Sequence, residues 1–461
     1  MTLNGVGLVR VTVAAPRRRM DLALPEDAVV AEIIPGLLAR AGDELADSGI
    51  AHGGWVLRRF DGSPLAPART LAGQRVRDGE VLRLAPRRQD WPELDYDDLV
   101  DAIATSSRRR PRWAPRYTRV AGLGLGAAVV LCGLIAVAGA GPDWSAPAHW
   151  ALGQAVLLLL AGIVLARVVG DEAAGAVAGL AALPYGFAWG LLSQAGDVPL
   201  TALGAPQLLV GCAALTAFAA VGYAAIGAGR WLFAGGAATG LFGLAGAWLG
   251  SDFPLSAAQI GAVLVGLLLP MSPLFGSLAI RLAKLPLPAL PRSTADLVRD
   301  DPQPPRRAVH AAVTRADALL TGLLIGASVV STIGIVALLG TGTLLDVVLA
   351  LVASAGFLLR SRLHPLVRQR IPLLLTGLTG PVAALLGAAR VNGPAGLMLG
   401  ASGLVAVGAL AIGIGMVYSR RGASPYLGRS AEIAEIVVIL AVLPLACTVL
   451  GLYGWLRGLG G

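Results

Sequence analysis

The sequence predicts a polytopic α-helical membrane protein with a small α+β domain at its N-terminus. Of its 461 residues, 56% are hydrophobic and only 14% are charged, whereas soluble domains average about 25% charged residues. The mean hydropathy is +0.71. Polar, arginine-rich sequence fills residues 1–119, and apolar stretches long enough to cross a bilayer follow it. We therefore expect a soluble domain over 1–89, a juxtamembrane linker over 90–119 and a transmembrane domain over 120–461.

The N-terminal domain has the pattern of two hairpin strands, a helix and two further strands. "LVRVTVAAP" (8–16) alternates apolar and polar residues, as a strand with one buried face does, and "RRRMDLALP" (17–25) follows after a short turn. The stretch 26–42 has acidic residues at its start, helical apolar spacing and Gly42 at its end. "WVLRRFDGSPL" and "RVRDGEVLRLAP" predict the last two strands. The order ββαββ is that of a ubiquitin-like β-grasp domain, although alternation alone indicates only a small α+β fold.

The linker is acidic first and basic afterwards. Residues 90–107 are partly amphipathic, and we expect a short helix there. The stretch 106–119, "SSRRRPRWAPRYTR", then carries six arginines next to the first apolar segment. We interpret it as a juxtamembrane anchor that is attracted to anionic lipid at about 1 kcal/mol per charge. An acidic surface of a partner is the alternative, and nucleic acid is not an expected ligand. The anchor residues are Arg108, Arg109, Arg110, Arg112, Trp113, Arg116, Tyr117 and Arg119.

Eleven apolar segments follow, each long enough to span a membrane. Pro184 in the third segment, and Pro270 and Pro273 in the sixth, predict kinks. The expected spans are 120–140, 150–169, 173–192, 205–227, 231–249, 256–280, 317–339, 344–359, 371–389, 395–418 and 431–455.

The charges between these spans predict the orientation. If the N-terminus is cytosolic, 22 of the basic residues after position 105 face the cytosol and only Arg390 and Arg457 face the other side. Such an excess is the positive-inside pattern. One span more or fewer would move the later loops to the opposite side and remove the asymmetry. We therefore expect a cytosolic N-terminus and a C-terminus on the outer side.

The sequence lacks the motifs of the common enzymes. There is no Gly-Lys-Ser/Thr phosphate loop, no HExxH zinc motif and no Gly-x-Ser-x-Gly elbow, and the four histidines are scattered. The spans hold almost no ionisable residues, which ion-coupled transporters usually need. Asp317, Glu432 and Glu435 lie near the cytosolic ends of their spans, where we expect them to pair with arginines or favour a helix N-terminus. We expect no catalytic residues, no cofactor and no metal.

The loops on the cytosolic side are the remaining candidates for a functional surface. The longest, 281–316, is rich in proline before it becomes amphipathic, and two shorter loops cover 360–370 and 419–435. Topogenic charge explains the arginines of these loops, but it does not explain the neighbouring Pro, His and Tyr, so a docking surface is an equal alternative. The candidate partner contacts are Arg360, Arg362, His364, Arg368, Arg370, Arg420, Arg421, Pro425, Tyr426 and Arg429.

The combination of a β-grasp head, a basic linker and eleven spans resembles EccD, the polytopic membrane component of actinobacterial and mycobacterial type VII (ESX) secretion systems. The local resemblance lies in "LPLPALP" (285–291), "RADALLTGLLIGASVV" (315–330), "RSRLHPLVRQRIPLLLTGLTG" (360–380) and the segment 420–459. The resemblance covers essentially the entire chain. It depends mainly on the architecture and on the last two segments, because apolar spans occur in many proteins.

The resemblance implies a non-enzymatic component of a bacterial inner-membrane secretion complex. It implies a homodimer within each protomer, spans that enclose a membrane cavity, and neighbours of the EccB, EccC and EccE types. EccC-like proteins are FtsK/SpoIIIE-like ATPases, and the exported proteins are small helical WXG100-type chains.

Two other functions fit parts of the pattern. The first is a stand-alone secondary transporter of a small apolar solute with a regulatory cytosolic domain, although no internal repeat is visible. The second is a membrane enzyme acting on lipid or glycan, which would need acidic or histidine clusters that the short outer loops do not supply.

Overall fold

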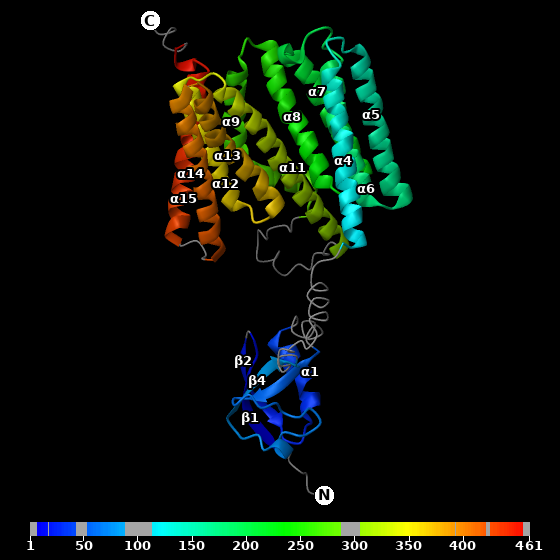
Figure 1. Cartoon of the computed structure of the whole chain (residues 1–461), viewed down its shortest axis with the longest axis vertical. Coiled ribbons are helices and arrows are strands. Elements are labelled where there is room, and N and C mark those ends of the chain that lie inside the picture. Colours follow the sequence, from blue (N-terminus) through cyan, green and yellow to red (C-terminus); the bar gives the residue numbers. More distant parts are fainter. Residues whose placement is uncertain are drawn as a thin grey trace, which may run out of the picture. The chain divides into compact units, whose positions relative to one another are not determined.

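The chain forms two units, residues 1–113 and 114–461, which are described separately. The computed structural model describes residues 7–16, 18–42, 53–87, 113–286, 305–391, 393–420 and 425–454. Figure 1 shows the strands of the first unit and the long helices of the second. The expected helix over 90–107 lies outside the described residues.

The first unit is a four-stranded mixed sheet with one helix, as the order ββαββ predicts. Strands β1 (Leu8–Ala14) and β2 (Arg19–Pro25) form the antiparallel hairpin, α1 (Val30–Ala41) follows, and β3 (Trp55–Arg59) pairs antiparallel with β4 (Glu80–Pro86). The strand order is β2-β1-β4-β3, with β1 and β4 parallel in the centre. This is the ubiquitin-like arrangement that the sequence predicts. A short 3-10 turn, Ala72–Gln74, precedes β4.

The core of this unit follows from the alternation along its strands. Val9, Val11 and Val13 point inward from β1, while Arg10 between them faces solvent. On the other side of the core, α1 buries Val30, Ile33, Leu37 and Ala41, which recur at helical spacing. Gly42 ends the helix with φ 147°, a conformation that favours glycine.

The second unit consists of long apolar helices that lie at the positions of the expected spans. Within the described residues, ten helices are each long and apolar enough to cross a membrane, and the count is eleven if one bent pair of helices is taken as a single span. The helices of the first half are α4 (Pro115–Gly139), α5 (Ser145–Val164) with its π-helical continuation Leu165–Val169, α6 (Glu172–Leu192), α7 (Ala205–Ala225) and α8 (Arg230–Asp252). Those of the second half are α9 (Ala257–Met271), α10 (Leu274–Leu282), α11 (Arg306–Leu339), α12 (Leu344–Arg360), α13 (Val367–Val391), α14 (Gly393–Arg420) and α15 (Pro425–Val449).

The prolines of the sixth and third spans have different effects. α9 and α10 meet at Ser272 and Pro273 with a bend of 74°, so the sixth span is broken as Pro270 and Pro273 predict. Pro184, by contrast, lies inside the uninterrupted helix α6. A proline therefore broke the helix only where a second proline followed three residues later.

Several helices begin earlier than the sequence pattern predicts, and α4 and α11 show why. α4 begins at Pro115, a favoured first helical residue, so the end of the expected linker forms its first turn. α11 begins at Arg306, so the expected loop 281–316 is helical from that residue onward. Both extensions carry arginines beyond the apolar stretch, where a helix leaves the membrane.

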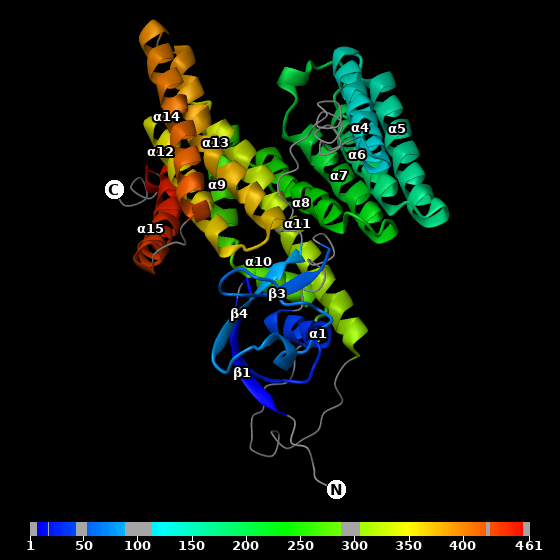
Figure 2. The ribbon, with the colours of Figure 1, turned by 60° about the horizontal axis from the view of Figure 1, so that its bottom comes forward.

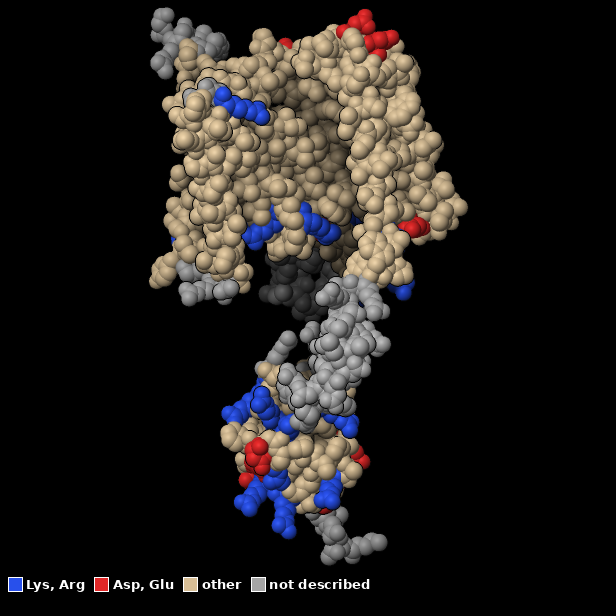
Figure 3. Space-filling model, viewed as in Figure 1, with Lys and Arg blue, Asp and Glu red and all other residues tan. Residues whose placement is uncertain are grey.

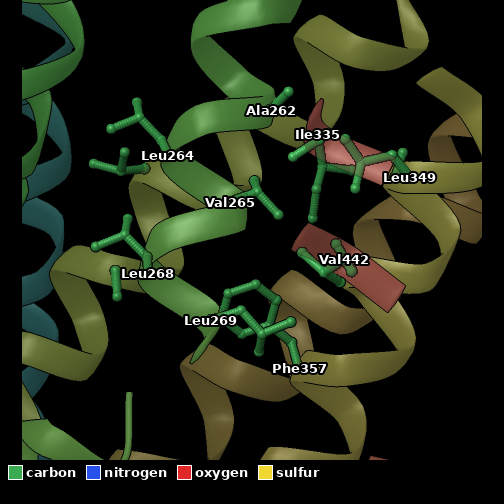
Figure 4. Packing of buried hydrophobic residues seen from close by; sticks show 14 of the residues in the cluster. Ala262, Leu264, Val265, Leu268, Leu269, Ile335, Leu349, Phe357 and Val442 are labelled. Atoms are coloured by element: carbon green, nitrogen blue, oxygen red, sulfur yellow. The ribbon is translucent and has the colours of Figure 1, made fainter. Parts of the chain in front are cut away.

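The largest hydrophobic core lies where α9, α11, α12 and α15 meet. Figure 4 shows Leu269 beside Phe357, with Val265 above them and Val442 of α15 close by. Leu269, Phe357 and Val442 are fully buried. This packing joins the sixth span to three later ones, so the second half of the chain is held around it.

Glycines set the close approach of α8 and α11. A Cβ on Gly322 would lie 2.4 Å from Cβ of Ala234, and one on Gly326 would lie 2.5 Å from Cβ of Ala238. Because no side chain larger than hydrogen fits there, this GxxxG pair permits backbone contact. Gly122 and Gly126 have the same spacing, but nothing lies within 4 Å of either Cβ position.

The helices of the second unit form two groups that α11 connects. Figure 2 shows α4 to α7 on one side and α12 to α15 on the other, with α11 between them. α11 packs against α8, α9 and α13, and α14 packs mainly against α13. The space-filling view in Figure 3 shows a hollowed face between the two groups.

Candidate functional site: the basic end of the transmembrane unit

Arginines gather at one end of the helix bundle, which we call the basic end. It comprises the N-terminal ends of α4, α6, α8, α11, α13 and α15 and the C-terminal ends of α5, α7, α10, α12 and α14. Figure 3 shows Lys and Arg atoms at the margin of the hollow on this side. The arginines of the basic end whose side chains are described are Arg116, Arg119, Arg167, Arg230, Arg281, Arg306, Arg307, Arg315, Arg360, Arg362, Arg368, Arg370 and Arg429.

A buried ion pair joins the end of α12 to α15. The Nη1 atom of Arg360 lies 2.7 Å from Oε1 of Glu435, and the two side chains are only 8% and 9% exposed. Arg362, which is 32% exposed, approaches the other carboxylate oxygen at 3.7 Å. Two guanidinium groups therefore share one carboxylate. Arg360 was a candidate partner contact, but the structure places its charge inside the chain.

A second cluster joins α11 to α13. Asp317 forms an ion pair with Arg368 and accepts a hydrogen bond of 2.8 Å from Nε2 of Gln369. The buried Gln369 side chain also lies 3.3 Å from Oγ1 of Thr321, which in turn donates to the carbonyl of Asp317. The carboxylate is thus held on two sides, and these contacts offset the cost of keeping its charge partly buried. The expected pairing of Asp317 and Glu435 with arginines is confirmed, whereas Glu432 is exposed.

His364 lies between these two clusters in the α12–α13 loop. Its imidazole is half-buried, and burial lowers its pKa below the ordinary value of 6.5. A hydrogen bond with Gln369 opposes this effect, and the nearby charge of Arg360 adds to it. The ring is therefore neutral near pH 7. Arg370 in the next helix is exposed, so it is open to contact from outside the chain.

A third set of contacts fixes the first spans at the basic end. Nη2 of Arg119 in α4 lies 2.5 Å from Oδ1 of Asp171, which also caps α6 by accepting from the backbone of Ala174. These contacts lower the pKa of Asp171, the cap being the larger cause. Nε of Arg167 donates to the carbonyl of Ala225 at 2.7 Å, which satisfies the C-terminal end of α7.

The expected lipid anchor is described only in part. Trp113 is 71% exposed, and Tyr117 carries the guanidinium of Arg116 over its ring at 4.8 Å. Such exposed aromatic and basic side chains suit the headgroup region. Four anchor residues lie outside the described residues: Arg108, Arg109, Arg110 and Arg112.

The last group of predicted contacts lies at the turn from α14 to α15. Tyr426 is 88% exposed, and Arg429 one turn further along α15 is exposed as well. Arg421 lies outside the described residues, and the side chains of Arg420 and Pro425 are not described. The structure thus leaves Arg362, Arg368, Arg370, Tyr426 and Arg429 on the surface of the basic end and takes Arg360 out of it.

The sequence pattern did not single out Gln369 and Thr321. Thr321 is a polar residue in an apolar stretch one turn after Asp317, and Gln369 stands between Arg368 and Arg370, which was the available signal. The arrangement they complete is one of paired charges and hydrogen bonds that fix helix ends. Among the described residues, no group of three His, Cys, Asp or Glu side chains is placed to hold a metal ion.

These features define a multi-pass helical membrane protein with a ubiquitin-like domain and a basic end crossed by ion pairs. Residues 118–459 match the family model described as the EccD-like transmembrane domain, and residues 8–84 match that of YukD, a protein of the WXG100 protein secretion system. Because the first match covers most of the chain, the protein belongs to the EccD family.

Curated relatives and solved structures resemble the chain over most of its length. The chain is 29% identical over 480 residues to the ESX-4 secretion system protein eccD4 of Mycobacterium tuberculosis, in both strain CDC 1551 / Oshkosh and strain H37Rv, and the match covers 100% of this chain and 99% of the relative. Protomer 1 of the ESX-3 core complex has a similar fold, with a TM-score of 0.61, 22% identity and coverage of 97% and 100% of the two chains. A chain of the MycP5-free ESX-5 inner membrane complex has a TM-score of 0.54 at 22% identity, covering 88% and 99%.

Proposed function

We propose that this protein is a non-enzymatic structural component of an ESX type VII secretion complex in a bacterial inner membrane. The observation that carries the proposal is that one chain joins a YukD-like domain to an EccD-like transmembrane domain, in the order of a full-length eccD4 relative. A shared order of two modules over 480 aligned residues supports a shared role more strongly than either module alone.

The orientation we propose places the basic end in the cytosol and the C-terminus on the outer side. The strong excess of arginines at one end supports this, because positive residues are retained on the cytosolic side during insertion. Arg390, at the opposite end of α13 from Arg370, is the one described basic residue of the other end. The ubiquitin-like domain, which precedes α4, then also lies in the cytosol.

Within the complex, we propose that the spans enclose a membrane cavity and that the protein dimerises within each protomer. The hollowed face in Figure 3 supports the first part. The second is supported by α14, whose long apolar side chains, among them Met398, Val405 and Ile412, are largely exposed. Such a surface needs lipid or another helix to cover it.

The cytosolic face would hold the energy-supplying partner. We propose that an EccC-like FtsK/SpoIIIE ATPase contacts the basic end and the ubiquitin-like domain, and that EccB-like and EccE-like components pack beside the spans. The exposed side chains that support a docking role are Arg362, Arg368, Arg370, Tyr426 and Arg429. Export of small helical WXG100-type proteins would then depend on this protein without any chemistry of its own.

Charge reversal at the two ends of one helix tests the docking proposal. Arg370→Glu places a negative charge on the basic end, and Arg390→Glu makes the same change at the other end of α13. Each variant is expressed as tagged protein in cells with an intact secretion system, and the co-purified ATPase is quantified. We expect Arg370→Glu to reduce the ATPase severalfold, and Arg390→Glu to leave it unchanged, at equal membrane levels. Equal recovery with both variants would contradict docking at the basic end.

A further inference from the structure

A cavity with charged residues in its lining opens at the basic end between three helices. It has a volume of about 380 Å³ and is lined by the start of α8, the first turns of α11 and the start of α13. Arg230, Arg315 and Arg368 line it from one helix each, together with Trp231 and Asp317. The contacts described above account for Asp317 and Arg368, but they leave the purpose of the other two arginines open.

The cavity has more positive charge than its own carboxylate balances. Asp317 is already held by Arg368 and Gln369. Nε of the half-buried Arg230 is shielded from solvent and has no hydrogen-bond partner among the described residues. Within the part of the chain that the structure describes, Arg315 donates to the carbonyl of Ala283, at 3.5 Å. A buried donor without a partner is costly, so an acceptor with negative charge would stabilise this arrangement.

The backbone at the start of α8 adds to the same preference. Gly229 precedes the helix with φ 67° and gives it no side-chain cap. The first N–H groups of α8 and the positive end of its dipole therefore lie beside the arginines at the cavity wall. The start of α8 attracts an anion less strongly than the arginines do, but it favours an anion as well.

The place of the cavity decides which anion it suits. It lies where α8 and α13 begin, at the level where helices leave the bilayer, and Trp231 is an interfacial type of residue. The exposed Val313 on α11 and Leu282 at the end of α10 present apolar surface near by, as acyl chains require. Basic pockets between transmembrane helices suit lipid headgroups.

We propose that this cavity binds the phosphodiester of an anionic phospholipid, with Arg230 and Arg315 as its main donors. The bound lipid bridges α8, which packs against α7 of the first group, the connecting helix α11, and α13 of the second group. It therefore stabilises the two groups against each other. This proposal concerns the lipid alone and does not depend on the secretion partners.

Lipid titration of the purified full-length chain in neutral detergent tests the proposal. Phosphatidylglycerol and phosphatidylcholine are added separately, and native mass spectrometry counts the lipids bound to the folded protein. The variants are Arg315→Gln and the double variant Arg230→Gln/Arg315→Gln. Arg307→Gln is the matched control, because Arg307 is an exposed arginine of the same helix that does not line the cavity.

The wild-type chain is expected to prefer phosphatidylglycerol by about tenfold or more, because phosphatidylcholine carries a cation beside its phosphodiester that the arginines of the cavity repel. The double variant should lose this preference, and Arg307→Gln should keep it. The proposal is wrong if the wild type shows no preference for phosphatidylglycerol, a result that does not depend on any variant folding. It is also wrong if Arg307→Gln loses as much of this preference as the double variant does. A titration with inorganic phosphate distinguishes a lipid headgroup from a dissolved anion as the occupant. If it raises the unfolding temperature as much as the lipid at equal concentration, the occupant is a dissolved anion and the lipid assignment fails.

Discussion

The Arg360–Glu435 pair predicts a large and specific loss of stability when its carboxylate is removed. Glu435→Gln keeps the shape of the side chain but leaves Arg360 charged in a site where both partners are more than nine-tenths buried. At an effective dielectric constant of about 20, two unit charges about 4 Å apart attract by about 4 kcal/mol. Breaking a buried pair by removing one partner costs about 3–5 kcal/mol, because the remaining charge is uncompensated.

The neighbouring arginine supplies the control. Arg362 lies 3.7 Å from the same carboxylate but is 32% exposed, so Arg362→Gln should cost about 1 kcal/mol or less. The replacement of both buried partners, Arg360→Met/Glu435→Leu, should recover most of the loss, because it buries no charge. Unfolding temperatures of the purified chain in detergent report all three. The reasoning is refuted if Glu435→Gln and Arg362→Gln are equally mild, or if the double replacement is as unstable as Glu435→Gln.

Three further outcomes are expected from stability measurements on the full chain. Gly326→Leu should destabilise by about 1–3 kcal/mol through overpacking of α8 against α11, whereas Gly122→Leu, with open space around it, should have little effect. Leu57→Ala should destabilise the ubiquitin-like domain by about 2–5 kcal/mol, seen as faster proteolysis within 8–86; unchanged cleavage would argue against the assigned core. Because burial lowers the pKa of His364, the folded chain binds its proton more weakly than the unfolded chain. Stability should therefore be full above pH 6.5 and fall as the pH drops through the folded pKa, and His364→Gln should flatten that decline.

The fold was largely predictable because its two patterns are strong and local. Period-two alternation, as at Val9, Val11 and Val13, fixed the strands, and long uncharged stretches fixed the spans. The loop charges supported the count of spans independently. Helix ends were less predictable, since Ala and Arg continue a helix beyond the apolar stretch, as at Arg306 in α11.

The candidate site was predictable in its location but not in its pairings. Arginines at loop ends indicate a basic face, yet sequence spacing does not show that Arg360 meets Glu435, 75 positions later. The lipid cavity depends on the same kind of information, because Arg230, Arg315 and Arg368 come from helices that tertiary packing alone brings together. Arg307 and Arg315 look alike in the sequence, but only the second lines the cavity.

The proposed role in secretion is tested most directly by purifying the tagged chain from mildly solubilised native membranes. Size analysis and mass spectrometry then show its assembly state and its partners. A megadalton-scale particle that contains an FtsK-like ATPase and other membrane components is the predicted result. Recovery of a lone monomer or dimer without an ATPase, in several detergents, would contradict a structural role in an ESX complex.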